Sequence, residues 1–309
     1  MRSTRREFLI DVSFVMAAAA FARDGARASR LPLAFSTLGC PGWDLPKILE
    51  FAQMHAFGAI ELRGLQGNMD LPSHPAFAKD QIAATKAQFA ARGIKIACVS
   101  SSARMGEQDV TKRTHEITGG KRFIDLASAL GTPYVRVFGD GEDLPKHAAP
   151  SQELKNRVAA GLKELGDYAA PKNVTVILES HDNFTSSKTL NDVLSQADSP
   201  HVALLWDAHH TFATAGEDPE FTVERLGKWI RHTHLKDSVQ SGDDRKYVLT
   251  GRGTVPVKKQ IESLENIGYR GYLCFEWEKV WHPDLEDPEI AFADYAQVVS
   301  GYLQDANKR

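Results

Sequence analysis

Four apolar segments of the chain end in clustered carboxylate and imidazole side chains. They end in Glu-Ser-His at 179–181, Asp-Ala-His-His at 207–210, His-Leu-Lys-Asp at 234–237 and Glu-Trp-Glu at 276–278. Burying acids at such positions is costly unless a cation or hydrogen bonds compensate their charge. A divalent cation does this naturally. Three carboxylates with one imidazole suit Mn²⁺, Mg²⁺, Co²⁺ or Zn²⁺, so the pattern predicts one divalent metal ion.

The predicted metal ligands are the side chains that close each segment. They are Glu179, Asp207, His234 and Glu276. Alternation along a strand puts His232 and His234 on the same side. His234 is nearer the carboxyl end and is therefore the better ligand. His232 is expected one layer deeper, hydrogen-bonded within the site.

These segments belong to a regular alternation of strand and helix. After Arg30, a short apolar or β-branched run followed by a segment of helical spacing recurs eight times. Such alternation predicts parallel strands with helices outside, and eight units close into a (β/α)8 TIM barrel. No Gly-x-Gly-x-x-Gly follows the first strand, which disfavours a dinucleotide-binding sheet. The predicted strands are Leu33–Ser36, Ala59–Arg63, Ile94–Ser100, Tyr134–Phe138, Val174–Glu179, Val202–Asp207, Ile230–His234 and Tyr272–Glu276.

Helical spacing fills the intervals between these strands. Gly93, Gly131 and Gly268 follow helical segments, where a left-handed cap is favoured. The widest loop region is predicted at Asp237–Thr254, after the seventh strand. In such a barrel the functional face lies at the carboxyl ends of the strands, where the acids and histidines lie. The predicted helices are Leu45–His55, Ala76–Arg92, Val110–Leu130, Ser151–Ala169, Ser187–Gln196, Pro219–Lys228, Val257–Ile267 and Pro288–Gln304.

The first residues resemble a targeting segment. Residues 3–9 read Ser-Thr-Arg-Arg-Glu-Phe-Leu, an apolar stretch follows, and Ala-Arg-Ala at 26–28 forms an A-x-A cleavage site. The stretch is too short to span a membrane, so no stable membrane anchor is expected. The domain prediction is a twin-arginine signal peptide at 1–28 and a single barrel domain at 29–309, exported to the periplasm.

The composition limits which classes of partner molecule are expected. The 309 residues carry a net charge of −3; without residues 1–28, 32 basic and 37 acidic residues remain, a net charge of −5. No basic stripe appears in the body of the chain, which disfavours a nucleic-acid partner. Cys98 and Cys274 lie in apolar runs and are interpreted as core residues, and the three cysteines form no disulfide framework.

Specific motifs make the body of the chain, from about Leu31 onward, resemble the sugar phosphate isomerase/epimerase superfamily, the xylose isomerase-like TIM barrels. The motifs are ValIleLeuGluSerHis at 176–181, TrpAspAlaHisHis at 206–210, HisThrHisLeuLysAsp at 232–237 and PheGluTrpGlu at 275–278. This resemblance implies a small-molecule sugar as substrate. Since oligomers are common in the superfamily, it also leaves room for a homo-oligomer.

The ketose 3-epimerase branch of that superfamily implies roles for individual residues. Its Glu, Asp, His, Glu metal set falls on Glu179, Asp207, His234 and Glu276, and its substrate-binding histidine falls on His210. The resemblance further implies that the two glutamates are catalytic. One would remove a proton beside a carbonyl and the other would return it, while the metal stabilises the enediolate.

Several further residues are candidates for binding the substrate. Where many ketose epimerases carry an arginine after the metal histidine, this chain has Lys236 in the sequence Lys-Asp-Ser. Lys236 is therefore expected beside a substrate oxygen or facing solvent, and Arg252 is expected to reach in from the following loop. His181, two residues after Glu179, is a further candidate.

Glu61 near the end of the second strand has two interpretations. It binds substrate hydroxyl groups, or it pairs with Arg63 or Arg136. The second interpretation makes it a structural residue rather than a substrate ligand.

Three reaction classes remain open beside isomerisation or epimerisation of an unphosphorylated sugar or keto-sugar. A lyase or hydrolase-type enzyme acting on 3-keto-glycosides needs the same proton abstraction, followed by loss of a leaving group. An abasic-site endonuclease occurs on related barrels, although the acidic charge disfavours it. A non-catalytic sugar-binding protein is the third alternative.

Overall fold

The computed structural model describes residues 31–141, 144–145, 148–242 and 244–306. The predicted signal peptide at 1–28 and its cleavage site lie outside the described residues. No helix in the described part of the chain is long and apolar enough to cross a membrane.

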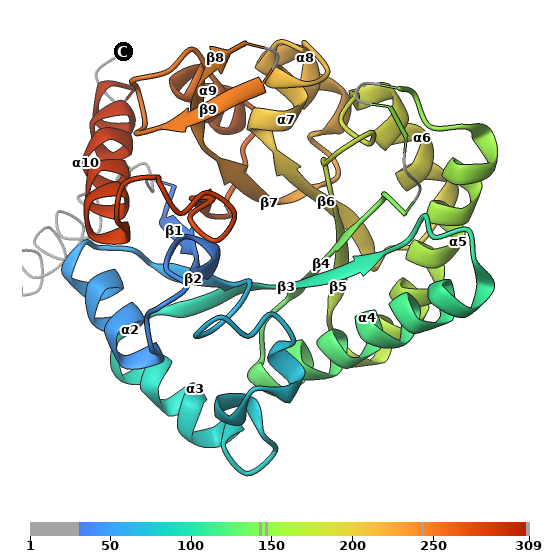
Figure 1. Ribbon diagram of the computed structural model, residues 1–309, viewed down its shortest axis with the longest axis horizontal. Coiled ribbons are helices and arrows are strands. Elements are labelled where there is room, and N and C mark those ends of the chain that lie inside the picture. The colour runs from blue at the N-terminus through green and yellow to red at the C-terminus, as the bar shows by residue number, and fades with distance from the viewer. Residues whose placement is uncertain (1–30, 142–143, 146–147, 243, 307–309) are drawn as a thin grey trace, which may run out of the picture.

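Eight parallel strands form a closed barrel, which confirms the predicted fold (Figure 1). Their order around the ring is β1-β10-β7-β6-β5-β4-β3-β2. Each strand therefore pairs with its neighbours along the chain, and the last strand, β10, closes against the first. The barrel strands are β1 (Leu33–Ser36), β2 (Ala59–Leu62), β3 (Lys95–Arg104), β4 (Tyr134–Phe138), β5 (Thr175–Glu179), β6 (Val202–Asp207), β7 (Ile230–Leu235) and β10 (Leu273–Phe275).

Helices surround the strands on the outside of the ring (Figure 1). Gly93, Gly131 and Gly268 adopt the predicted left-handed conformation, with φ of 66°, 76° and 73°. The helices are α2 (Leu45–Met54), α3 (Ile82–Ala91), α4 (Val110–Leu130), α5 (Gln152–Ala169), α6 (Ser187–Ala197), α7 (Ala208–Ala213), α8 (Pro219–Leu226), α9 (Val257–Asn266) and α10 (Pro288–Ala306), with short 3-10 turns at Thr37–Gly39, Leu71–Ser73, Pro75–Phe77 and Ala170–Lys172.

One predicted helix is shorter in the structure. The range Ala76–Arg92 was expected to be helical throughout, but α3 begins only at Ile82. Pro75 begins a separate 3-10 turn, in which His74 Nδ1 accepts a hydrogen bond from the Ala76 amide at 3.1 Å. Proline favours the first turn of a helix, so this short turn forms before the α-helix starts.

The predicted loop at Asp237–Thr254 contains an antiparallel hairpin. Its strands are β8 (Asp237–Ser241) and β9 (Asp244–Val248), with Ser238 opposite Tyr247. Most side chains of the hairpin are polar, so it lacks the alternating apolar pattern that marks a half-buried strand. The sequence therefore gave no strand signal there.

Small apolar residues fill the barrel interior. One layer contains Ala34, Ala59, Ala97 and Cys274. The next contains Cys98, Ile177, Ala203 and Leu205. The core positions predicted for Cys98 and Cys274 are confirmed, and all three cysteines are buried and free.

Asp237 fixes the chain that follows β7. Its carboxylate is fully buried and accepts hydrogen bonds from four backbone amides, those of Ser238 (2.8 Å), Gly251 (2.9 Å), Gly253 (2.8 Å) and Val255 (3.1 Å). A Cβ added at Gly253 would lie 2.1 Å from Asp237 Oδ1, so only glycine fits there. This one side chain holds the hairpin and the chain after it against the barrel.

Replacing Asp237 with alanine should destabilise the protein by about 3 kcal/mol, because buried amides would lose their acceptor. Urea unfolding followed by circular dichroism measures the change. Asp284→Ala, at an exposed acid, is the matched control and should change stability by less than about 0.5 kcal/mol. Equal unfolding midpoints for the two variants would show that Asp237 does not hold this segment.

Candidate metal centre

Strand register brings the four predicted ligands to the same end of the barrel. Asp207 in β6 lies directly opposite His234 in β7, and His234 lies opposite Cys274 in β10, two residues before Glu276. On the other side, Glu179 in β5 lies opposite Leu205, two residues before Asp207. This stepwise stagger is the shear of a closed barrel. It carries the four side chains around the ring into one interior cluster.

The donor atoms of Glu179, Asp207, His234 and Glu276 all lie within 4.8 Å of one another. His234 Nδ1 is 3.4 Å from Glu179 Oε1, 3.2 Å from Glu276 Oε2 and 3.9 Å from Asp207 Oδ2. Asp207 and His234 are fully buried, and Glu276 is 4% exposed. Three carboxylates therefore surround one imidazole nitrogen in a nearly closed space.

Glu61 fixes the orientation of the His234 ring, and with it the position of His234 Nδ1. Its carboxylate lies 2.8 Å from His232 Nε2 and 2.8 Å from His234 Nε2, and it accepts a hydrogen bond from Ser36 Oγ at 3.0 Å. Burial opposes ionisation of Glu61, but the two histidines outweigh burial and hold its pKa well below the usual range. An ionised carboxylate only accepts, so both Nε2 atoms donate, and a neutral His234 presents an unprotonated Nδ1.

These residues fit a divalent metal. His234 Nδ1 has no hydrogen-bond partner among the described residues, although three carboxylates face it. In metal sites, the histidine that binds the ion usually donates its other ring N–H to a carboxylate, which fixes the orientation of the imidazole. Burial lowers the pKa of His234, yet Glu276, Glu61 and Glu179 together raise it well above the ordinary value. The cluster thus attracts positive charge at the centre, which a metal ion would supply.

Two cations lie around the carboxylates. Arg136 Nε is 3.1 Å from Glu179 Oε2. Lys236 Nζ donates to Asp207 Oδ2 at 2.7 Å, to Glu278 Oε1 at 2.9 Å, and also to Glu276. Lys236 is 1% exposed, which corrects the expectation that it faces solvent. Its ammonium group contacts the ligand carboxylates themselves.

The cations keep both candidate catalytic glutamates ionised. Burial raises the pKa of Glu179, but Arg136 outweighs it, and the pKa lies below the ordinary value. Burial also opposes ionisation of Glu276, whereas His234 and Lys236 lower its pKa well below that value. Asp207 differs, because burial raises its pKa to about 6 despite Lys236. Glu179 and Glu276 are therefore available as proton acceptors at neutral pH.

Two predicted substrate-binding histidines lie at the rim of the cluster. His210 Nε2 is 3.5 Å from Asp207 Oδ2 and has no hydrogen-bond partner among the described residues. Burial and the nearby Lys236 hold the pKa of His210 well below its ordinary value, so its ring is neutral. His181 contacts His210 edge-on, with ring centroids 5.0 Å apart, and pairs with Asp182 at 3.1 Å. Both side chains are partly exposed, at 16% and 32%, which makes this rim the accessible side of the centre.

The structure corrects two expectations about substrate ligands. Glu61 neither faces a substrate site nor pairs with Arg63 or Arg136, because it is fully buried behind the centre and holds His232 and His234. Arg252 does not reach the centre either. Its guanidinium is exposed and pairs with Asp294 of α10 at 2.7 Å. The predicted deeper position of His232 is confirmed, since it is buried and hydrogen-bonded to Glu61.

Sequence reasoning gave two residues near the centre, Tyr247 and Arg63, no role of their own there. Tyr247 of the hairpin packs against His209, with ring centroids 5.4 Å apart, and its ring lies 5.9 Å from Lys236 Nζ. Arg63 is 5% exposed and donates to Ser102 Oγ at 3.1 Å. The strand-end rule places Arg63 at the end of the predicted second strand, where it was considered only as a partner of Glu61; in the structure Arg63 directly follows β2. That rule gives no signal for Tyr247, which comes from a strand outside the barrel.

The fold and this cluster define a barrel protein with a candidate metal site at the carboxyl ends of the strands. The family described as Xylose isomerase-like TIM barrel matches residues 49–295, and the chain belongs to this family. This match confirms the superfamily that the sequence motifs predict.

Individual proteins are similar to the chain over different lengths. An inosose dehydratase of Clostridium botulinum (strain Eklund 17B / Type B) is 26% identical over 292 residues, which are 82% of this chain and 90% of that protein. An inosose dehydratase of Geobacillus thermodenitrificans (strain NG80-2) is 26% identical over 163 residues. That match covers 47% of this chain and about half of that relative's length, 52%.

Solved structures with the same fold include enzymes of the epimerase kind. An L-ribulose 3-epimerase is 18% identical, with a TM-score of 0.72, over 90% of this chain and 96% of that chain. The IOLI protein with a binding zinc atom is 21% identical, with a TM-score of 0.69, over 88% of this chain and 99% of that chain. At these identities the likeness supports the fold.

Metal content tests the centre before any substrate is known. Protein purified with excess Mn²⁺ or Zn²⁺ and then desalted should carry about one ion per chain, and Asp207→Ala and His234→Ala should each retain less than about a tenth of it, because each removes a ligand. Mass spectrometry of the metal measures this. The bound ion should also raise the melting temperature of the wild type, but of neither variant.

His115→Ala, at an exposed histidine on α4, is the matched control and should bind metal as the wild type does. Full metal content in folded Asp207→Ala or His234→Ala would rule out this ligand set.

Proposed function

We propose that this protein is a divalent-metal-dependent isomerase or epimerase that moves a proton beside the carbonyl of an unphosphorylated sugar or keto-sugar. The observation that carries the proposal is the placement of Glu179 and Glu276. Glu179 ends β5 and Glu276 directly follows β10, and these two strands flank the β6–β7 pair that carries Asp207 and His234. Two carboxyl groups thus approach one centre from either side, where one can remove a proton as the carboxylate and the other can return one as the acid.

The proposed roles follow from charge and burial. A metal held by Glu179, Asp207, His234 and Glu276 would polarise the substrate carbonyl and offset charge on the enediolate. One glutamate removes the proton from the carbon next to the carbonyl, and the C–H electron pair enters the new C–C double bond. The carbonyl π pair moves onto its oxygen in the same step. The other glutamate must first take up a proton from water; it then delivers this proton to the opposite face of the same carbon, and the carbonyl re-forms. In an isomerisation the proton goes to the neighbouring carbon instead, after the hydroxyl proton of the first carbon has moved to the former carbonyl oxygen.

Two cationic side chains of the protein affect the basicity of the two glutamates. Arg136 beside Glu179 and Lys236 beside Glu276 stabilise the ionised form of each base. They lower its basicity as well, so the substrate carbon must be acidified by its carbonyl. His210, neutral and without a hydrogen-bond partner at Nε2 among the described residues, is suited to orient a substrate hydroxyl group. His181 lies beside it at the rim.

A second candidate reaction uses the same first step. The curated relatives named above are inosose dehydratases, and loss of water is an elimination of the lyase type. After proton abstraction, departure of a hydroxyl group from the neighbouring carbon would give a dehydrated product. This supports the lyase alternative, with a keto-sugar or inosose as substrate.

We further propose export through a twin-arginine signal at residues 1–28, with cleavage after Ala28. Twin-arginine sequence, apolar stretch and A-x-A site follow in the expected order. An exported enzyme would meet mainly unphosphorylated sugars, which agrees with the proposed substrate class.

Deuterium exchange distinguishes the two reactions. Metal-loaded protein in D₂O, incubated with a panel of free ketoses and an inosose, should place deuterium on the carbon next to the carbonyl without bond cleavage. Glu179→Gln and Glu276→Gln should each slow this exchange by at least about 100-fold, because each removes a proton-transfer group. Nuclear magnetic resonance shows which carbon carries the deuterium, and mass spectrometry measures the mass of the product.

Glu164→Gln, at a glutamate on α5 that pairs with the surface residue Lys121, is the matched control and should exchange at the wild-type rate. Products that have lost water would favour the dehydratase. Wild-type exchange rates in both glutamine variants would overturn the proposed proton transfer in either reaction.

A further inference from the structure

A cavity of about 740 Å³ lies at the opposite end of the barrel from the metal centre. Its walls come from the beginnings of the strands and the ends of the helices that precede them. Lys95 is the first residue of β3, Tyr134 is the first of β4, and Tyr272 directly precedes β10. The cavity falls within the size range of small-molecule sites, roughly 300–1,000 Å³.

The charges around this cavity have one sign. Its lining includes Lys86, Lys95, Arg231 and Arg270, and none of the described residues that line it is an aspartate or glutamate. In a chain whose net charge is −3, an acid-free cavity with four cations is a local exception. Clustered charges of one sign in a concave site raise the local concentration of ions of opposite sign.

No carboxylate compensates these four cations within the described part of the chain. Lys86 Nζ donates to the Ala129 carbonyl at 3.1 Å, and Arg231 Nη1 donates to the carbonyls of Lys228 and Ile230. Arg270 Nη1 donates to its neighbour's carbonyl. Carbonyl groups satisfy donors without neutralising their charge. The positive charge is thus left for a ligand.

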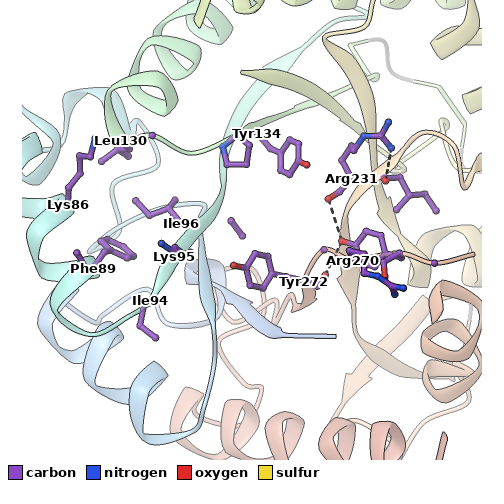
Figure 2. Close-up of a pocket in the computed structure, with 18 of the residues that line it drawn as sticks. Lys86, Phe89, Ile94, Lys95, Ile96, Leu130, Tyr134, Arg231, Arg270 and Tyr272 are labelled. Carbon is purple, nitrogen blue, oxygen red and sulfur yellow. Dashed lines mark hydrogen bonds between the residues drawn. The ribbon is translucent and has the colours of Figure 1, made fainter. Parts of the chain in front are cut away.

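Figure 2 shows how the two sides of the cavity face each other. Lys86 and Lys95 lie on one side with Phe89, and Arg231 and Arg270 lie on the other. Tyr134 and Tyr272 project between them. Apolar side chains complete the lining, among them Ile94, Ile96, Leu130 and Ile230. The site therefore combines an apolar, aromatic body with a basic rim.

The phenol hydroxyls of Tyr134 and Tyr272 are available to donate hydrogen bonds to a ligand. Neither phenol hydroxyl has a hydrogen-bond partner in residues 31–306 where the structure describes them. Burial raises the pKa of Tyr134 and of Tyr272, which keeps both hydroxyls protonated at neutral pH. Among the lining residues that the structure describes there is no carboxylate, histidine or cysteine that could perform catalysis.

We propose that this cavity binds an organic anion, a molecule with an apolar ring or chain and one carboxylate, sulfonate or phosphate group. The apolar part would pack on the aromatic and aliphatic walls, and the cations on both sides, among them Lys95 and Arg231, would attract the anionic group, to which a tyrosine hydroxyl would donate. Charged donors strengthen such hydrogen bonds. The site is separate from the metal centre and does not depend on the function proposed for that centre.

Anilinonaphthalene sulfonate is a suitable probe because it joins an aromatic body to one sulfonate. Fluorescence titration of the full chain should show one site, weakened by added salt. The Lys95→Gln/Arg231→Gln double variant should bind at least about tenfold more weakly. Both side chains are exposed, so folding should persist, as the urea midpoint verifies. Lys95→Glu, a single charge reversal, should weaken binding as well.

Two controls make the test specific. Lys112→Gln, at an exposed lysine in the first turn of α4, should bind the probe as the wild type does. Phenylnaphthylamine, which lacks the sulfonate, should bind at least about tenfold more weakly. Unchanged affinity in the double variant, equal affinity for the neutral amine, or no binding of the sulfonate would overturn the proposal.

Discussion

Compensation of buried negative charge is the constraint on which this barrel depends. Glu61, Glu179, Asp207 and Glu276 converge on one interior end, and each is at most 4% exposed. Burying a charged side chain costs several kcal/mol unless oppositely charged or hydrogen-bonding groups offset that cost. The chain supplies Arg136 and Lys236, together with the histidines on Glu61, yet leaves His234 Nδ1 unpartnered among the described residues. The protein thereby holds the cluster in place, and its carboxylates and His234 Nδ1 form a candidate site for a cation.

The sequence predicted the clustering of Glu179, Asp207, His234 and Glu276 because their placement depends on local features. Strand direction, period-two alternation and the alternation of strand and helix all extend over a few residues, and parallel strands end on one side. Partners across the barrel have no such local signal. Glu61 and His232 are 171 residues apart. Nothing in the spacing around Glu61 could show that it would hold a histidine of β7, or that Lys236 would be buried among carboxylates.

The segment after β7 shows the same limit. Asp237–Thr254 is rich in polar residues and has no apolar periodicity, so a loop was the natural prediction. Asp237 organises it instead, through four backbone amides that include those of Gly251 and Gly253. The resulting hairpin brings Tyr247 beside His209 at the rim of the metal centre. The buried Asp237 carboxylate thus orders this polar segment, and the ordered segment forms one side of the site.

The two ends of the barrel have opposite character although the same strands form both. β7 has Arg231 near its start and His234 near its end, three residues or about 10 Å further along. Between the ends lie two layers of small apolar residues, among them Ala97 and Cys98. These apolar side chains separate the charged groups of the two ends, so we expect a substitution at the basic rim to change the carboxylate cluster only if it moves a strand. Because close-packed strands shift little, each end can be tested by mutation without disturbing the other.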